Sequence, residues 1–136
     1  MKTTANTPII IKKGSVSPYV NPQGKNQLCW DMMPRGLSAN LSIGFDSMEP
    51  DACNGLGVHD TWDQVFILIA GSGTLVSGEK RIPIEAPSLV FIPKGTSHDV
   101  VTGANERIEY YYINSYDPVV MPKVIRTGDD QSEQEK

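Results

Sequence analysis

Few residues of this chain could bind a metal ion or move a proton at neutral pH. The sequence has two histidines, His59 and His98, and an imidazole can do either near pH 7. The run Tyr110–Tyr112 adds three phenol groups. The patterns of other chemistries are absent, because there is no Walker loop, no G-x-G-x-x-G and no G-x-S-x-G, and neither cysteine has the local signature of a nucleophile.

Strand alternation favours one common site for the histidines. Side chains two residues apart share a face of an extended strand. Three sets arise in this way: Gly57, His59 and Thr61; Gln64, Phe66 and Leu68; His98, Val100 and Thr102. A barrel of two sheets can point all three sets inward. Asp60 and Asp63 then point outward, which makes them poorer ligand candidates.

The elements that must position these residues are short strands. Leu41, Ile43 and Phe45 alternate with polar residues, which predicts a half-buried strand over Ala39–Asp46. The apolar run Gln64–Ala70 predicts a central strand buried on both faces and ended by Gly71-Ser72-Gly73. Phe66, Phe91, Leu68 and Leu41 are expected in the core or the pocket wall.

Turn residues separate further predicted strands. The predicted strands are Leu28–Met32, Thr74–Ser77, Ser88–Ile92, Ser97–Thr102 and Arg107–Asn114. Gly78-Glu79 predicts the turn of a hairpin, and Pro93-Lys94-Gly95 ends a strand. No segment shows an apolar stripe of helical period, so the fold class is all-β, a sandwich or barrel.

Composition limits the class of protein and its partners. The chain has 136 residues, 39% of them hydrophobic, which fits one globular domain that needs no disulfide or metal to fold. The net charge of −4 disfavours nucleic acid or an anionic membrane as the main partner. The longest apolar run has six residues, Val65–Ala70, too short for a membrane span or a signal peptide. Two cysteines without a secretion signal predict reduced thiols and a cytoplasmic protein.

Two segments of the chain resemble the two sequence motifs of the cupin superfamily. Pro93, Gly95 and His98 match the Pro-x-Gly-x-x-His of the second motif. His59 and Gly71 match a histidine and the closing glycine of the first. The resemblance covers residues 57–102 and implies a single jelly-roll β-barrel, the double-stranded β-helix of a small single-domain (type-2 conserved barrel) cupin.

The chain departs from the family motifs at four positions. Gly57 stands where the first motif has its first histidine, and Gln64 replaces its glutamate. Pro87 stands at the opening glycine of the second motif, and Thr102 at its asparagine. The fifteen residues Ser72–Ala86 between the motifs suit small single-domain cupins.

The resemblance implies a site for a divalent ion such as Fe, Mn, Ni, Cu or Zn, held by His59, Gln64 and His98. Some small metal-binding cupins carry glutamine in the slot of Gln64. A fourth ligand would come from elsewhere, and an inward phenolate of Tyr110, Tyr111 or Tyr112 could supply it.

Three functions follow from this resemblance. A neutral ligand set leaves the ion electrophilic, which favours Lewis-acid chemistry of isomerase or lyase type on a small oxygenated molecule. Tyr110 and Tyr112 are then the predicted catalytic proton donors or acceptors. A cupin-type dioxygenase is one alternative. The other is a non-enzymatic barrel that binds a small molecule without metal, in which the histidines are hydrogen-bonded inside the fold.

Both ends of the chain are expected to lie outside the barrel domain of residues 8–126. Residues 1–7 are predicted to be flexible, and residues 127–136 to form a disordered acidic tail without apolar residues. Ile9–Val20 has strand character at Ile9–Ile11 but little to pair with in a minimal barrel. Pairing with the sheet of a second copy would cover an edge, so we expect a homodimer.

Overall fold

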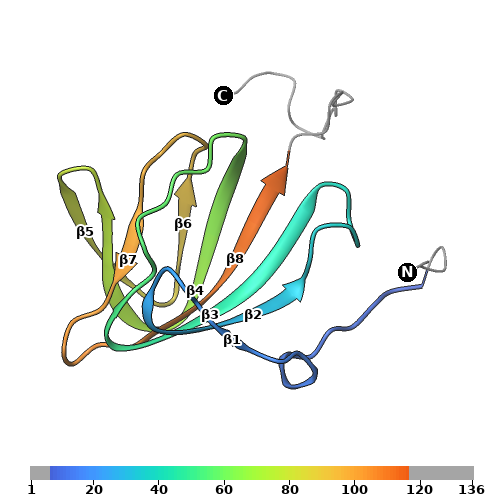
Figure 1. Cartoon of the computed structure of the whole chain (residues 1–136), viewed down its shortest axis with the longest axis horizontal. Helices are drawn as coiled ribbons and strands as arrows, with labels where there is room; N and C mark the ends of the chain where they lie inside the picture. The colour runs from blue at the N-terminus through green and yellow to red at the C-terminus, as the bar shows by residue number, and fades with distance from the viewer. Residues whose placement is uncertain (1–6, 117–136) are drawn as a thin grey trace.

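Two long strands organise the barrel, which a computed structural model describes over residues 7–116 (Figure 1). They are β3 (Leu41–Cys53) and β4 (Trp62–Ser77). The remaining elements are η1 (Lys13–Ser15), β1 (Tyr19–Val20), β2 (Lys25–Met33), β5 (Lys80–Glu85), β6 (Ser88–Ile92), β7 (Asp99–Val101) and β8 (Ile108–Tyr116). The described residues thus form the predicted all-β jelly-roll barrel, and their one helical element is a single 3-10 turn.

All strand pairings are antiparallel, and β8 lies between the two long strands. On one side β8 pairs with β3 from Leu41↔Ser115 to Met48↔Ile108. On the other side it pairs with β4, which also pairs with β6. The far ends of β3 and β4 both pair with β7, and β5 completes a hairpin with β4. Each long strand therefore contributes to both walls of the barrel.

The long strands bend where they pass from one wall to the other. The β4 register shifts between Leu68 and Ala70, and Gly71 follows with φ +82°. A Cβ atom at Gly71 would overlap the carbonyl oxygen of Arg107, so glycine fits both the backbone angle and the space. In β3, Asp51 takes φ +56° after the pairing with β8 ends. The prediction that Gly71-Ser72-Gly73 ends the strand is wrong, because these residues form a corner within it.

The apolar core is built mainly from side chains of β3, β4, β7 and β8. Its most buried side chains come from four strands: Met48, Phe66, Leu68, Val100, Ile108 and Tyr110. Phe66 and Leu68 are therefore core residues, as predicted. Ser88–Ile92 is a strand with the predicted bounds, and Gly78-Glu79 is the turn between β4 and β5.

The outer face of β4 is exposed in the single chain, so the prediction of burial on both faces is wrong. Ile69 is 49% exposed, and Ile67 is also exposed. On neighbouring β6, Phe91 is 56% exposed and Leu89 points outward as well, so Phe91 is neither core nor pocket wall. Four residues, Ile67, Ile69, Leu89 and Phe91, together form what we call the outer apolar face.

Strand β3 carries buried polar residues on one of its faces. Ser42 and Asp46 are buried there, and Asp46 lines a cavity inside the barrel. Phe45 lies on the opposite face, where the rings of Trp30 and Tyr111 pack edge-on against it at centroid distances of 5.5 and 4.9 Å. Alternation gave the period of this strand correctly but not which of its faces lines the interior.

Ile9–Ile11 form no strand within the single chain, and their pairing with the sheet of a second copy stays a prediction. The first described strand is β1, which pairs with β2 of the same chain at Tyr19↔Cys29 and Val20↔Leu28. The predictions for residues 1–6 and for the tail 127–136 concern segments outside the described residues. Among residues 7–116 no helix is long and apolar enough to cross a membrane.

Candidate functional site

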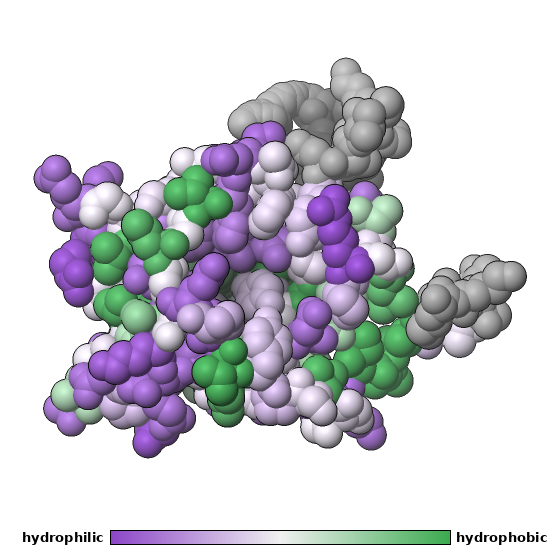
Figure 2. All heavy atoms as spheres, in the orientation of Figure 1, coloured by the Kyte–Doolittle hydropathy of each residue, from purple (hydrophilic) through white to green (hydrophobic). Residues whose placement is uncertain are grey.

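A cavity of about 320 Å³ opens into the barrel beside the apolar core. Its lining is mostly polar and comes from two groups of residues. One group surrounds the histidines: Gly57, His59, Gln64, Phe66, His98 and Asn114. The other lies along β1–β3 and β8: Tyr19, Cys29, Asp46 and Tyr112, with Asn21, Gln23, Asn54 and Gly55 nearby. In the view of Figure 1 the molecular surface is mainly hydrophilic, with its hydrophobic residues in small separate groups (Figure 2).

Backbone hydrogen bonds fix the two histidines relative to each other. The N–H of Gly57 donates to the carbonyl of His98, and the N–H of His98 donates back to the carbonyl of Gly57, both at 2.9 Å. The N–H of Gly95 donates to the carbonyl of His59 at 2.7 Å. The turn of the second motif is therefore bonded to the loop of the first, and the two imidazole centroids lie 5.1 Å apart.

Both ring nitrogens of His98 face oxygen atoms. Its Nδ1 lies 2.9 Å from the carbonyl oxygen of Thr96, and its Nε2 lies 3.1 Å from Oε1 of Gln64. The side chain of His98 is 2% exposed, so water does not surround it. A neutral imidazole carries one N–H, so it can donate to only one of these two oxygens.

A relay of hydrogen bonds holds Gln64 in place. Its Nε2 donates to Oδ1 of Asn114 at 2.7 Å, and Nδ2 of Asn114 donates to Oγ of Ser42 at 3.1 Å. Oγ of Ser42 lies 2.9 Å from the hydroxyl of Tyr116. Because the amide nitrogen of Gln64 is engaged with Asn114, its oxygen is the atom directed at His98.

His59 is less buried than His98 and lies toward the rim. Its ring stacks on Trp62 with a centroid distance of 4.9 Å and an interplanar angle of 22°. Burial lowers the pKa of His59, and repulsion from a charged His98 lowers it further, while hydrogen bonding to Gln64 acts in the opposite direction. His59 is therefore held in its neutral form, which is the form that binds a metal ion.

The three consecutive tyrosines occupy three different environments. Tyr110 is 1% exposed in the core, where its hydroxyl donates to Sδ of Met48 at 3.8 Å, and it does not line the cavity. Tyr111 packs on the outer face against Phe45. Tyr112 lines the cavity, and burial raises its pKa well above the usual value. Of the two predicted catalytic tyrosines, the structure brings Tyr112 and not Tyr110 to the cavity.

Asp46 is a cavity residue that sequence reasoning did not select. It is 5% exposed, and burial raises its pKa from 3.8 to about 6 despite nearby polar groups that favour the ionised form. The neighbouring thiol of Cys29 has its pKa raised to about 12, first by burial and then by the charge of Asp46. The only signal in the sequence was the polar face of Ala39–Asp46, which alternation alone assigns to solvent.

Among the described residues, the histidines have no acidic partner of metal-binding geometry. Within residues 7–116 no group of three or more His, Cys, Asp or Glu side chains could hold a metal ion. The side chains that could bind a metal ion in this cavity are therefore His59, Gln64 and His98, which offer two imidazoles and one amide oxygen. The three predicted ligands do line one cavity.

Comparison with models of protein families identifies the family of this chain. The family model described as "AraC-like ligand binding domain" matches residues 44–118, more than half of the sequence. The chain belongs to this cupin-type family. A search of curated proteins finds no match to this cupin.

Solved structures share the fold of this cupin at low sequence identity. A predicted oxalate decarboxylase from Thermotoga maritima has a TM-score of 0.73 at 17% identity, covering 79% of this chain and 99% of its own. The polyketide cyclase RemF from Streptomyces resistomycificus has a TM-score of 0.71 at 16% identity, covering 86% and 89%. A cupin-2 domain from Rhodospirillum rubrum has a TM-score of 0.60 at 15% identity, covering 79% and 73%. At these identities the likeness establishes the small cupin barrel and not an activity.

Proposed function

We propose that this cupin binds a small oxygenated molecule in the cavity and acts on it with a divalent metal ion held by His59, Gln64 and His98. The reaction type we propose is a Lewis-acid isomerisation or elimination. One observation supports the metal most strongly: the two ring nitrogens of the buried His98 both face oxygen acceptors.

These contacts suit a bound cation. If Nδ1–H of His98 donates to the Thr96 carbonyl, the lone pair of Nε2 faces a lone pair of Gln64 Oε1 at 3.1 Å. Two facing lone pairs repel each other unless a cation lies within reach of both. The separation of 3.1 Å is close to that of adjacent ligands on one ion with bonds of about 2.1 Å. The Thr96 contact also supplies the outer hydrogen bond that metal-binding histidines usually make.

The ion would polarise a carbonyl, enol or carboxylate oxygen of the bound molecule. The side chains of the cavity would orient that molecule and limit the access of water to it. Phe66 forms an apolar wall, with its ring edge-on to His98 at 6.1 Å. Because its pKa is raised, the Tyr112 hydroxyl stays protonated at neutral pH and would donate a hydrogen bond rather than act as a phenolate ligand.

A metal-free ligand-binding domain is the second candidate. Gly57 in place of the family's first histidine favours it, as does the neutral donor set. A cupin-type dioxygenase has less support, because Fe(II) oxygenases commonly use two histidines and a carboxylate, and no described Asp or Glu joins His59 and His98 in such a cluster.

Metal content of purified protein tests the proposal. We would measure bound Mn, Fe, Ni, Cu and Zn by elemental analysis after gentle purification and supplementation. The variants His59→Ala and His98→Ala should lose the metal while remaining folded. Asp60→Ala is the matched control, since it removes an exposed carboxylate beside His59 and should keep the metal. Wild-type protein without stoichiometric metal would favour the metal-free candidate.

We also propose that the protein is a cytoplasmic homodimer. Cys29 and Cys53 are free thiols, which suits a reducing compartment. The outer apolar face is the surface of the single chain that a second copy would cover, because it presents four large apolar side chains on two adjacent strands.

A further inference from the structure

A row of polar side chains leads away from the histidines across three strands. Gln64 on β4 pairs in register with Asn114 on β8, and Asn114 pairs in register with Ser42 on β3. All three side chains are buried, and hydrogen bonds join them in this order and then reach the hydroxyl of Tyr116. We call these residues, Gln64, Asn114, Ser42 and Tyr116, the polar row. Its first member contacts His98, so the polar row connects the proposed ion site with the end of β8.

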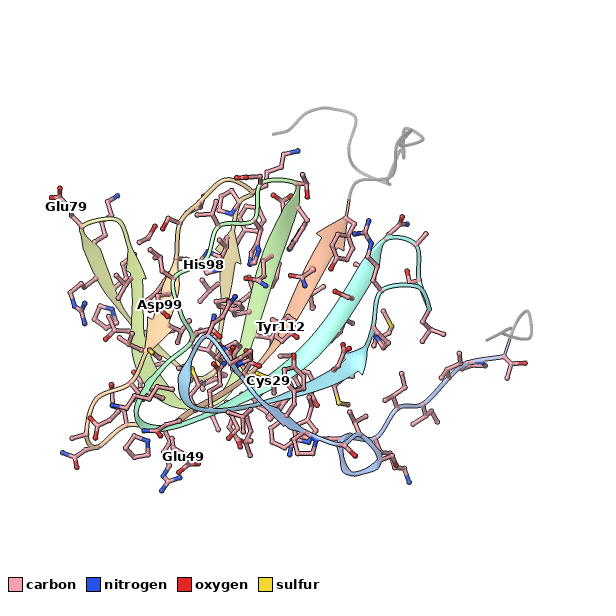
Figure 3. The ribbon with its side chains drawn as sticks, viewed as in Figure 1. Cys29, Glu49, Glu79, His98, Asp99 and Tyr112 are labelled. Carbon is pink, nitrogen blue, oxygen red and sulfur yellow. The ribbon has the colours of Figure 1, made fainter. Side chains whose placement is uncertain are left out.

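The polar row begins at the histidine end of the cavity. Gln64 lines the cavity together with His59 and His98. Nε2 of His98 lies 3.1 Å from Oε1 of Gln64, and hydrogen bonding to Gln64 also acts on His59. Figure 3 shows His98 apart from Cys29 and Tyr112 and nearer β6. The atom of Gln64 that faces the imidazoles therefore decides what they can bind together.

Every bond of the polar row joins groups that can exchange the roles of donor and acceptor. A carboxamide presents an oxygen acceptor and a nitrogen donor in nearly the same shape, and a hydroxyl can act as either. In the structure the nitrogen of Gln64 donates to Asn114, and the nitrogen of Asn114 donates to Ser42. The hydrogen of Ser42 can then go to the oxygen of Tyr116. This polarity directs the oxygen of Gln64 at His98.

Rotation of both carboxamides by half a turn gives a second complete set of hydrogen bonds. The hydroxyl of Tyr116 then donates to Ser42, which donates to the oxygen of Asn114. The nitrogen of Asn114 donates to the oxygen of Gln64, whose nitrogen now faces Nε2 of His98. Rotation of Gln64 alone would instead place its oxygen where its nitrogen lies, 2.7 Å from Oδ1 of Asn114, with no hydrogen between two buried acceptors. The polar row therefore reverses as a unit.

The two polarities suit different partners of His98. When Nδ1–H of His98 donates to the carbonyl of Thr96, Nε2 presents a lone pair. A cation bound to this lone pair needs the oxygen of Gln64 beside it, which is the polarity of the structure. Without a cation, the reversed polarity supplies an N–H donor to the same lone pair, so that both ring nitrogens of the buried His98 are paired.

We propose that the polar row is a positioning device of the ion site with two states. It holds the oxygen of Gln64 toward His98 when a cation is bound, and the nitrogen toward His98 when none is bound. Asn114 transmits the reversal, since it bonds to both neighbours. Tyr116 stabilises the cation-bound state, because only in that state does the hydrogen of Ser42 need Tyr116 as its acceptor. The cation-bound state rests on the proposed metal site, whereas the reversed state does not.

An N–H···N hydrogen bond between Gln64 and His98 exists only in the reversed state and can be measured directly. In protein labelled with nitrogen-15, a scalar coupling between the two side-chain nitrogens reports this bond, and the chain has only two histidines to assign. At about pH 8, where an ordinary imidazole is neutral, we expect the coupling in chelator-treated wild-type protein and its loss on saturation with Zn²⁺. Asn114→Asp offers only oxygen acceptors to Gln64 and Ser42. Once its spectrum shows that it is folded, this variant should lack the coupling with and without Zn²⁺.

The affinity for Zn²⁺ tests the outer end of the polar row. Tyr116→Phe removes the acceptor of Ser42 in the cation-bound state and should weaken Zn²⁺ binding about three- to tenfold, the effect of one hydrogen bond. The matched control is Tyr111→Phe, which removes a hydroxyl from the outer face of the same strand and should leave the affinity unchanged. Titration calorimetry measures the affinity of both variants and of wild-type protein.

Three results would overturn the inference. They are a coupling that is absent from metal-free wild-type protein, a coupling that persists with Zn²⁺ bound or in Asn114→Asp, and equal affinities of Tyr116→Phe and Tyr111→Phe. The outcomes also separate this inference from the metal proposal. If no Zn²⁺ binds, the metal proposal and the cation-bound state fail, while a coupling present in wild-type protein and absent from Asn114→Asp still supports the reversed state. If Zn²⁺ binds but metal-free protein shows no coupling, the metal site stands and the polar row has one state.

Discussion

Substitution of Gln64 by glutamate changes the charge of the proposed metal site without changing its shape. The new carboxylate would face Nε2 of His98, as the amide oxygen now does at 3.1 Å. It would also face Oδ1 of Asn114, which at present accepts from Gln64. Rotation of the Asn114 amide would restore a donor at that contact, because Ser42 and Tyr116 beyond it have hydroxyls that can donate in either direction.

The expected effect differs between metal-free and metal-bound protein. Without metal, a carboxylate at this buried position should lower the free energy of unfolding by about 1–3 kcal/mol. With metal, two unit charges 4 Å apart attract by about 4 kcal/mol at an effective dielectric constant of about 20. Desolvation of the carboxylate offsets part of this attraction. We therefore expect metal binding to tighten by about 10- to 100-fold, the equivalent of roughly 1.4–3 kcal/mol.

Isothermal titration calorimetry with Zn²⁺ and Mn²⁺ measures the affinity, and thermal unfolding with and without metal measures the stability. The control Gln64→Leu removes the oxygen and should weaken binding. The reasoning fails if Gln64→Glu binds metal no more tightly than wild-type protein while its metal-free form is destabilised. That result would mean that the ion, if any, binds elsewhere.

Four further outcomes are expected. Gly57→His should tighten metal binding by calorimetry, because apart from the adjoining residues no described atom lies closer than 4.0 Å to the position of a Cβ there; unchanged affinity would place Gly57 outside the site. Metal bound by His59 and its partners should be lost in equilibrium dialysis as the pH falls below the ordinary imidazole pKa of 6.5, since protonated imidazoles repel the ion, and burial shifts this loss to lower pH because it lowers the pKa of His59; an affinity that does not change with pH would exclude the histidines as ligands. Asp46→Asn should raise the free energy of unfolding by up to about 3 kcal/mol near pH 8 but by much less near pH 4, because the folded pKa of about 6 lies above the unfolded value of 3.8 and the penalty grows as pH rises between them; denaturant titrations with a pH-independent difference would refute this. Ile67→Lys combined with Phe91→Lys should give a monomer by light scattering, and a wild-type protein that is already monomeric would refute the dimer.

The fold could be predicted from the sequence because its signals are local. Strand alternation and turn residues gave the all-β class, and the Pro93–Gly95 turn with His98 gave the family. The sequence predicts the end of a strand at Gly71, because Gly71-Ser72-Gly73 is equally typical of a strand end and of a corner within a strand. Only the close approach of the Arg107 carbonyl to Gly71 distinguishes a corner from a strand end, and Arg107 is distant in sequence.

The candidate site was predicted in part, for a physical reason. His59, Gln64 and His98 lie in motif segments, so their meeting in one cavity could be inferred from the family pattern. Asp46 could not, because a polar face of a strand usually faces water, whereas in this barrel the polar face of β3 lines an internal cavity. Likewise, the apolar face of β4 was expected to be buried within the chain but is exposed on it.

The central position of β8 has a consequence for how the chain acquires its structure. β8 is the last of the described strands in sequence, yet it lies between β3 and β4 and pairs residues as far apart as Leu41 and Ser115. During synthesis, the edges of β3 and β4 that pair with β8 therefore stay unpaired until β8 has left the ribosome. Such non-local pairing slows folding, and open edges favour association with other chains. Nascent chains that stop short of Ile108 should accordingly depend on chaperones, whereas those that extend past Tyr116 can close the barrel.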